Sequence, residues 1–88
     1  MIIGKVVGNI VSTRKLDGLQ GYKLLVVQNR NSGETFVAAD AIGAGIGENV
    51  LVATGANARF GLHRDAPIDA LVVGIIDREP DIPGEAAD

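Results

Sequence analysis

The stretch whose residue types most suggest chemistry is rich in glycine: Gly43-Ala44-Gly45-Ile46-Gly47-Glu48. Glycine loops cradle phosphates when they follow a strand and open a helix with the spacing Gly-x-Gly-x-x-Gly. Here Glu48 takes the third required position, residues typical of a strand follow directly, and no lysine comes next as a P-loop requires. We therefore interpret the stretch as a tight backbone turn in which glycine permits left-handed or crowded conformations. Such a turn would also let loops of several subunits approach one another.

The side chains that usually bind metals or act as nucleophiles are few and poorly placed. His63 is the only histidine and cysteine is absent, so a metal site would have to combine His63 with carboxylates such as Asp65 and Asp69. Ser12 and Ser32 have no base at a spacing that suggests nucleophilic catalysis. The sequence therefore predicts no catalytic, cofactor-binding or metal-binding site, and a protein that is not an enzyme.

Five short aliphatic runs, separated by Gly, Asn, Asp and Ser, predict the strands that would position these residues. The runs are Ile2–Thr13, Tyr22–Gln28, Thr35–Ala39, Val50–Thr54 and Asp69–Asp77. No long helical periodicity accompanies them, and we expect at most one helical turn near residues 57–60. Five short strands in 88 residues predict an all-β fold, a small five-stranded β-barrel whose closure protects the sheet edges.

The first run alternates with a period of two. Its even positions, from Ile2 to Ser12, predict one apolar face, and its odd positions predict a mixed face. Gly4 and Gly8 fall on the apolar face, and glycine inside a strand often marks a sharp bend or the close approach of another backbone. Both features suit a strand that curls around a small barrel.

The aliphatic content exceeds what a lone barrel of this size can easily hide. Hydrophobic residues make up 47% of the chain, and so small a domain buries little more than about 60% of the surface of its unfolded chain. Leu24–Val27, Leu71–Val73 and Ile75–Ile76 are aliphatic on both strand faces. No amphipathic helix is long enough to cover the outward faces. The pattern therefore predicts a homo-oligomer, and it does not distinguish five subunits from six.

Negative charge is concentrated at the C-terminal end. Residues 79–88 contain four acids, two prolines and no base, in a chain whose formal net charge is -3. We expect one domain over residues 1–78 and a flexible acidic tail over 79–88. The N-terminal residues do not predict a secretory signal, and no apolar run approaches the roughly 20 residues that span a bilayer. We therefore expect a cytoplasmic protein with no membrane partner.

Binding of single-stranded nucleic acid is the alternative function, because five-stranded Greek-key barrels often bind oligonucleotides. That function uses a cationic groove with aromatic stacking platforms. The chain has one Tyr, two Phe and no Trp, its pI is about 4.9, and its lysines and arginines are scattered. The residues therefore favour a structural assembly protein over one that binds nucleic acid.

Motifs in a fixed order extend over nearly the whole chain. The first run carries Gly4-x-Val6-x-Gly8-x-x-x-Ser12-Thr13-x-Lys15. The most specific stretch is Val37-Ala38-x-Asp40-x-x-Gly43-Ala44-Gly45-x-Gly47-Glu48-x-Val50-Leu51-Val52, and Gly55-x-x-Ala58-Arg59 follows it. In order and spacing, these motifs resemble the EutN/CcmL family, the pentameric vertex proteins of bacterial microcompartment shells such as those of carboxysomes and metabolosomes.

The resemblance implies an OB-fold-like barrel assembled as a five-fold ring, acting as a structural shell protein at the vertices of a microcompartment in the cytoplasm. Flat hexagonal sheets cannot close and five-fold units introduce the needed curvature, so the implied partners are hexameric shell proteins. The resemblance also implies that several residues lie near subunit contacts or the ring axis: Asp40, Gly43, Gly45, Gly47, Glu48, Gly55, Ala56, Asn57 and Arg59. Arg59 would donate to a carbonyl or carboxylate of the neighbouring subunit.

Two positions depart from the family's pattern. The family commonly has two serines before the Ala-Arg pair, where this chain has Ala56 and Asn57. Asn57 can still donate and accept hydrogen bonds, whereas the side chain of Ala56 cannot. If those serines line a pore or bond across the interface, this chain does so differently.

Overall fold

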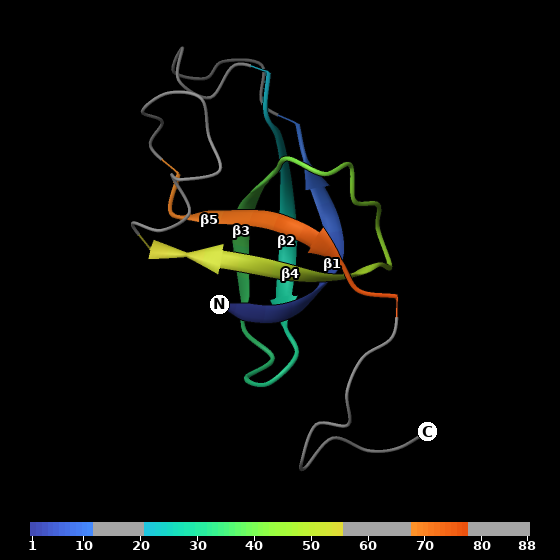
Figure 1. The fold of residues 1–88 in the computed structure, drawn as a ribbon, viewed down its shortest axis with the longest axis vertical. Helices are drawn as coiled ribbons and strands as arrows, with labels where there is room; N and C mark the ends of the chain where they lie inside the picture. The colour runs from blue at the N-terminus through green and yellow to red at the C-terminus, as the bar shows by residue number, and fades with distance from the viewer. Residues whose placement is uncertain (12–20, 56–67, 78–88) are drawn as a thin grey trace.

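The computed structural model describes residues 1–11, 21–55 and 68–77, which form a closed barrel of five strands (Figure 1). The strands are β1 (Ile2–Ile10), β2 (Lys23–Asn29), β3 (Thr35–Asp40), β4 (Asn49–Thr54) and β5 (Ala70–Ile75). Their order around the barrel is β1-β2-β3-β5-β4, and β4 pairs back to β1. The predicted five-stranded β-barrel is confirmed, with one strand in each of the five aliphatic runs.

Two of the predicted strands are longer than the observed ones, because a strand ends where its partner ends. The first run was expected to extend to Thr13, but β1 stops at Ile10, which pairs with Leu24 near the start of β2. The last run was expected to cover 69–77, but β5 stops at Ile75, which pairs with Val50 near the start of β4. The expected helical turn near 57–60 and the tail at 79–88 lie outside the described residues.

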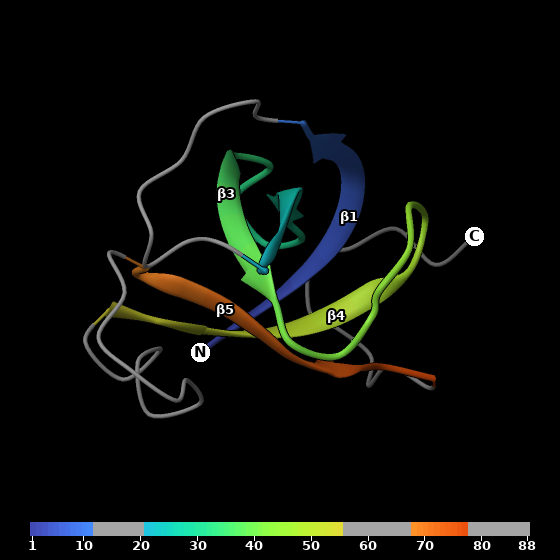
Figure 2. The ribbon, with the colours of Figure 1, turned by 90° about the horizontal axis from the view of Figure 1, so that it is seen from above.

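The five strand pairs that close the barrel differ in direction and length. Four of its five strand pairs are antiparallel, and the fifth, between β3 and β5, is parallel. This parallel pairing joins Ala39 to Leu71 and Asp40 to Val72, so the first part of β3 has no register partner on β5. Seen from above, the strands surround one interior, and β3 approaches β5 only with its C-terminal end (Figure 2).

β1 contains a β-bulge that reverses its faces. Val6 is fully buried and pairs with buried Val27 of β2, but the register then shifts and Gly8 pairs with half-buried Val26. Val7 is the extra residue, and its side chain is exposed. The predicted alternation continues beyond Val6, where Gly8 and Ile10 are half-buried and Asn9 is exposed, but the inserted residue moves these even positions from the interior face of the barrel wall to the outer face.

The two glycines of β1 have different roles. A Cβ atom at Gly4 would overlap Cγ1 of Val27 and lie 3.0 Å from the carbonyl oxygen of Gln28, so the expected close backbone approach is confirmed there. A Cβ atom at Gly8 would lie 3.8 Å from Cβ of Val26, an ordinary contact. Gly8 therefore belongs to the bulge rather than to a crowded crossing.

Apolar side chains pack on both sides of the barrel wall. The interior cluster consists of Val6, Leu25, Val27, Ala38, Ala44, Val50, Val52, Ala70 and Val72. An outer cluster consists of Ala39, Ile68 and Leu71, with Tyr22, Leu24 and Val73 packed against it. The chain therefore buries part of its outward aliphatic surface by itself. Among the described residues, the large aliphatic side chains left exposed include Val7, Val37, Ile42 and Ile46.

Candidate functional site

The loop from 41 to 48, between β3 and β4, contains four of the nine predicted site residues, and the side chain of Asp40, the last residue of β3, holds the first half of this loop. Asp40 is 8% exposed. Its Oδ1 accepts hydrogen bonds from the backbone N–H groups of Ile42 (2.9 Å) and Gly43 (3.0 Å), and its Oδ2 accepts one from that of Ala44 (2.8 Å). A carboxylate that accepts three neighbouring N–H groups satisfies donors that a sharp turn would otherwise leave unpaired.

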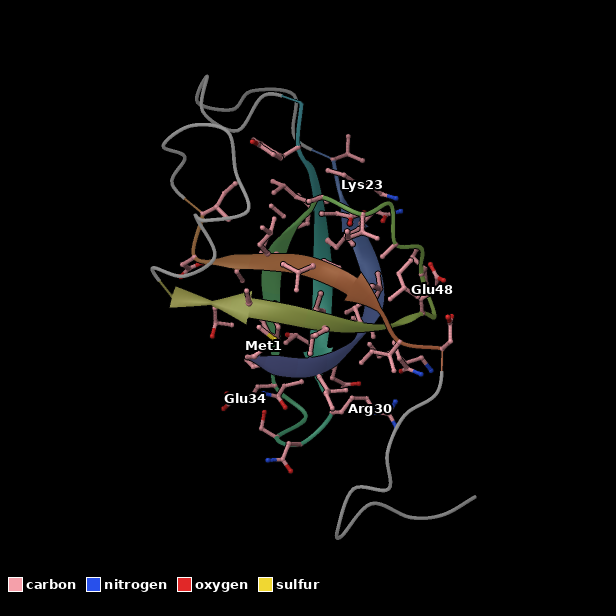
Figure 3. The ribbon with its side chains drawn as sticks, in the orientation of Figure 1. Met1, Lys23, Arg30, Glu34 and Glu48 are labelled. Atoms are coloured by element: carbon pink, nitrogen blue, oxygen red, sulfur yellow. The ribbon has the colours of Figure 1, made fainter. Side chains whose placement is uncertain are left out.

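Ala44 closes one end of the barrel. It is fully buried and belongs to the interior cluster, although it lies in a loop. Its N–H donates to Asp40, and its carbonyl oxygen accepts a 3.2 Å hydrogen bond from Nζ of Lys23 on β2. Figure 3 shows Lys23 beside this loop. The loop is therefore attached to β2 and β3 and packs into the core at its centre.

The second half of the loop is held by Glu48 and by β1. Oε1 of Glu48 accepts a 2.7 Å hydrogen bond from the N–H of Gly45. The N–H of Gly47 donates to the carbonyl of Val6 (2.8 Å), and the N–H of Val6 donates to the carbonyl of Glu48 (3.0 Å). These two backbone hydrogen bonds continue the pairing of β1 with β4 into the end of the loop, and they fix the position of the loop relative to β1.

The glycines of this loop confirm the prediction of a tight turn. Gly43 and Gly47 have φ values of 98° and 94°, in the left-handed region that favours glycine. The backbone N–H groups of residues 42 to 45 all donate to carboxylates of the chain itself. The loop therefore does not offer these donors to a phosphate, which agrees with the rejection of a nucleotide-binding motif.

The fixed loop exposes two large aliphatic side chains. Ile42 is 50% exposed and Ile46 is 61% exposed. They flank buried Ala44, whose contacts hold the backbone between them. Exposed isoleucines on a tightly bonded loop are suited to contact with another protein surface.

Gly55 lies apart from the other described site residues. It follows β4, has a φ of 69°, and its N–H donates to the carbonyl of Asp69 at 2.7 Å. The loop precedes β4 and Gly55 follows it, so the length of β4, on the order of 17 Å at ~3.4 Å per residue, separates them. Ala56, Asn57 and Arg59 lie outside the described residues, as does His63.

A hollow of about 500 Å³ lies beside the first part of β3, where β3 has no partner on β5. Its lining residues come from the starts of β1, β3 and β5, the ends of β2 and β4, and the neighbouring turns: Ile2, Asn29, Ser32, Glu34, Thr35, Phe36, Val37, Thr54, Gly55, Asp69 and Ala70. We refer to this surface as the β3 hollow. Sequence reasoning missed it, because residues this far apart in the chain carry no local signal of their proximity.

The described residues do not provide other kinds of site. Within 1–11, 21–55 and 68–77, no three His, Asp or Glu side chains are grouped so that they could hold a metal ion. The same ranges contain no helix long and apolar enough to cross a membrane. The rings of Tyr22 and Phe36 are half-buried against the two apolar clusters, so neither is freely presented as a stacking platform for bases.

Comparison with known proteins gives a consistent result. The family model described as ethanolamine utilisation protein EutN/carboxysome matches residues 1–77. The bacterial microcompartment shell vertex protein GrpN of Rhodospirillum rubrum is 47% identical over 83 residues, which cover 88% of this chain and 93% of that protein. The carboxysome shell vertex protein CcmL of Synechocystis is 48% identical, with 88% and 83% covered.

A solved structure extends the similarity to three dimensions. The GrpN pentameric microcompartment shell protein from Rhodospirillum rubrum has a TM-score of 0.83 and 45% identity to this chain, and the match covers 93% of this chain and 100% of that one. The findings do not support the alternative of a nucleic-acid-binding barrel. The resemblance of the sequence motifs is confirmed, and the chain belongs to the EutN/CcmL family.

Proposed function

We propose that this chain is a structural protein whose pentamers cap the vertices of a bacterial microcompartment shell. The observation that supports this most is its similarity, over 93% of its length, to a pentameric microcompartment shell protein that is covered completely. The exposed Ile42 and Ile46 of the fixed loop support an assembling protein, because they offer apolar surface for a subunit contact.

The proposed role is mechanical rather than catalytic. The carboxylates of Asp40 and Glu48 accept hydrogen bonds from backbone N–H groups of their own loop, which is a structural use of these groups. A five-fold unit placed in a flat hexagonal layer introduces curvature, and hexameric shell proteins are therefore the proposed partners. The location that follows is the shell of a microcompartment.

The residues of the glycine-rich loop and of the segment after β4 are the proposed subunit contacts. In the loop these are Gly43, Gly45, Gly47 and Glu48, together with Asp40 at the end of β3; Asp40 and Glu48 act by holding the loop backbone. In the second segment they are Gly55, Ala56, Asn57 and Arg59. The loop precedes β4 and the described Gly55 follows it, so we assign the two groups to two different contact surfaces.

Native mass spectrometry tests the oligomeric state. A mass of five times the 9.1 kDa chain is expected at micromolar concentration, and a stable monomer there would overturn the proposal. Shell capping is tested by coexpression with a hexameric shell protein, examined by electron microscopy. Closed polyhedral particles are expected with this chain and open sheets or tubes without it; an identical outcome in both cultures would count against the vertex role.

A further inference from the structure

The acidic segment at 79–88 follows closely after a residue that is connected to Arg30. The N–H of Ile76, just beyond β5, donates to the carbonyl oxygen of Asn49 (2.8 Å), and Oδ1 of Asn49 accepts a 2.7 Å hydrogen bond from Nη1 of Arg30. Figure 3 shows Arg30 on the side of the barrel where the chain leaves β5. Residues 79–88 contain four acids and no base, so a strongly acidic stretch starts three residues after this connection.

The position of Arg30 is fixed by its neighbours. Its own N–H donates to the carbonyl oxygen of Ile3 (3.0 Å), and the turn that carries it is held by Oδ1 of Asn29, which accepts the N–H of Asn31 (2.8 Å). Because β1 lies between β2 and β4, a side chain that starts after β2 and reaches Asn49 has to cross the first part of β1. A guanidinium has five N–H donors in a planar fork, so it can bind Asn49 and a carboxylate at the same time.

A hollow of about 370 Å³ lies beside this arginine, and we refer to it as the Arg30 pocket. Its lining consists of Met1, Ile2, Ile3, Asn29, Arg30 and Asn31. Ile2 and Ile3 are half-buried and provide an apolar wall, and among the described lining residues Arg30 is the one with a charged side chain. The pocket is therefore suited to an aliphatic side chain that lies next to a carboxylate.

A second base lies on the same part of the barrel wall. Lys5 is exposed and pairs directly opposite Asn49. Gly4 is buried between Ile3 and Lys5, so these two side chains are on the outward face of β1. The outer wall beside the end of β5 therefore carries two positive charges.

The described acids nearest to this wall do not line the Arg30 pocket. Glu34 lines the β3 hollow, and the carboxylate of Glu48 binds the N–H of Gly45. Asp77 is exposed and is followed directly by Arg78, so their charges offset each other where the acidic segment begins. The charge that the pocket presents is therefore positive, and it is complementary to residues 79–88.

The sequence of the segment matches the pocket in spacing as well as in charge. It begins Glu79-Pro80-Asp81-Ile82-Pro83, and prolines at this spacing favour the polyproline II conformation. With three residues per turn, Glu79 and Ile82 face the same side, about 9 Å apart at ~3.1 Å per residue. The prolines also reduce the conformational entropy that docking costs.

We propose that the acidic segment docks on its own barrel, with the carboxylate of Glu79 on the guanidinium of Arg30 and the side chain of Ile82 in the Arg30 pocket. Glu79 is three residues from Ile76, a reach of roughly 10 Å in extended chain, and Ile76 and Arg30 bind the same asparagine. The segment lies beyond residues 1–77, the part that matches the family model. The docking is therefore a property of this chain in addition to its proposed vertex role.

Disulfide trapping tests the docking, because the chain has no cysteine of its own. Asn31→Cys on the pocket is paired with Gly84→Cys, which leaves Glu79 and Ile82 in place. The matched control pairs Gly84→Cys with Val7→Cys, since Val7 is exposed on β1 two residues beyond Lys5 and does not line the pocket. With oxidised glutathione, we expect the first pair to form a disulfide within one chain at least about tenfold faster than the control, because docking raises the effective concentration of the two thiols.

Charge variants in the first cysteine pair test the contact between Glu79 and Arg30. Arg30→Gln keeps an amide that can donate to Asn49 but removes the charge, and we expect it to slow trapping about fivefold, as for a partly exposed ion pair. Glu79→Gln should slow trapping equally, and the double variant no further, because both changes remove one interaction. Lys23→Gln and Glu85→Gln are the controls for charge and should leave the rate unchanged. Ile82→Ser should slow trapping through loss of the apolar contact.

The outcomes are distinct. Equal trapping rates for the pocket pair and the Val7 pair would overturn the docking, and so would additive effects of Arg30→Gln and Glu79→Gln. Disulfides between two chains, seen as dimers after denaturation, would also overturn it, since the segment would then occupy a neighbouring copy. Far-UV circular dichroism checks that each variant folds. If Arg30→Gln does not fold, slower trapping of the unmodified cysteine pair in 1 M NaCl replaces it, and a rate unaffected by salt then counts against the ion pair.

Discussion

The carboxylate of Asp40 and the buried Ala44 are joined by a 2.8 Å hydrogen bond that seats a loop residue in the barrel core. The same carboxylate accepts hydrogen bonds from two further backbone N–H groups, those of Ile42 and Gly43. One side chain therefore provides the acceptors that a neighbouring strand would provide within a sheet. The conformation of the loop, and with it the exposure of its isoleucines, depends on this arrangement.

Replacement of Asp40 by Ala should destabilise the chain by about 3 kcal/mol, because three N–H groups, one of them buried, lose a charged acceptor. Asp40→Asn should cost less, since one amide oxygen remains. The measurement is urea-induced unfolding at one fixed protein concentration, because assembly shifts the apparent stability. Asp77→Asn, at an exposed position, is the control and should change little. Equal midpoints for Asp40→Ala and this control would contradict the role of the carboxylate.

Gly4→Ala should destabilise the barrel by about 1–3 kcal/mol through overpacking. The added methyl group would overlap Cγ1 of Val27, which is fully buried, and would lie 3.0 Å from the backbone carbonyl oxygen of Gln28. Gly8→Ala places the same group in ordinary contact with Val26 and serves as the control. Thermal melting followed by circular dichroism should show a lower midpoint for Gly4→Ala than for Gly8→Ala, and the reverse order would refute the proposed crowding.

Gly47→Ala should cost about 1–2 kcal/mol from backbone conformation alone. Its φ of 94° is in the left-handed region, and a Cβ atom there would meet no other atom within 4 Å. Gly45→Ala is the matched control, because Gly45 has no positive φ and its Cβ would lie 3.5 Å from Oε1 of Glu48. Chemical unfolding should separate the two variants, and equal loss of stability in both would rule out this explanation.

Arg59→Ala should weaken the oligomer if Arg59 is the interface donor that we propose from the family resemblance. We expect the concentration for half-dissociation to rise about tenfold, in line with the loss of one charged interface hydrogen bond in each contact. Native mass spectrometry and thermal melting check this, with Arg59→Lys as the variant that keeps the charge. An unchanged ring mass and melting midpoint for Arg59→Ala would refute the role.

Local features of the sequence were enough to locate the five strands. The clusters of Val, Ile and Leu and the glycines between them act over a few residues, so each predicted run overlaps one observed strand, three of which extend one residue beyond the predicted run. The turn at Gly43 and Gly47 was predictable for the same reason. The hydrogen bonds of Asp40 have a local signal too, since Asp is favoured at strand ends and turns, where its carboxylate accepts N–H groups of residues that follow closely.

By itself, therefore, the sequence determined the strands, the glycine turns and the family, because these depend on residue order and short-range geometry. The tertiary structure decided which way the side chains face. The bulge at Val7 puts Gly8 on the outer wall, and that depends on the pairing of β1 with β2. The β3 hollow likewise exists only because β3 pairs with β5 at Ala39 and Asp40 and not earlier, a contact between segments some thirty residues apart that no local pattern encodes.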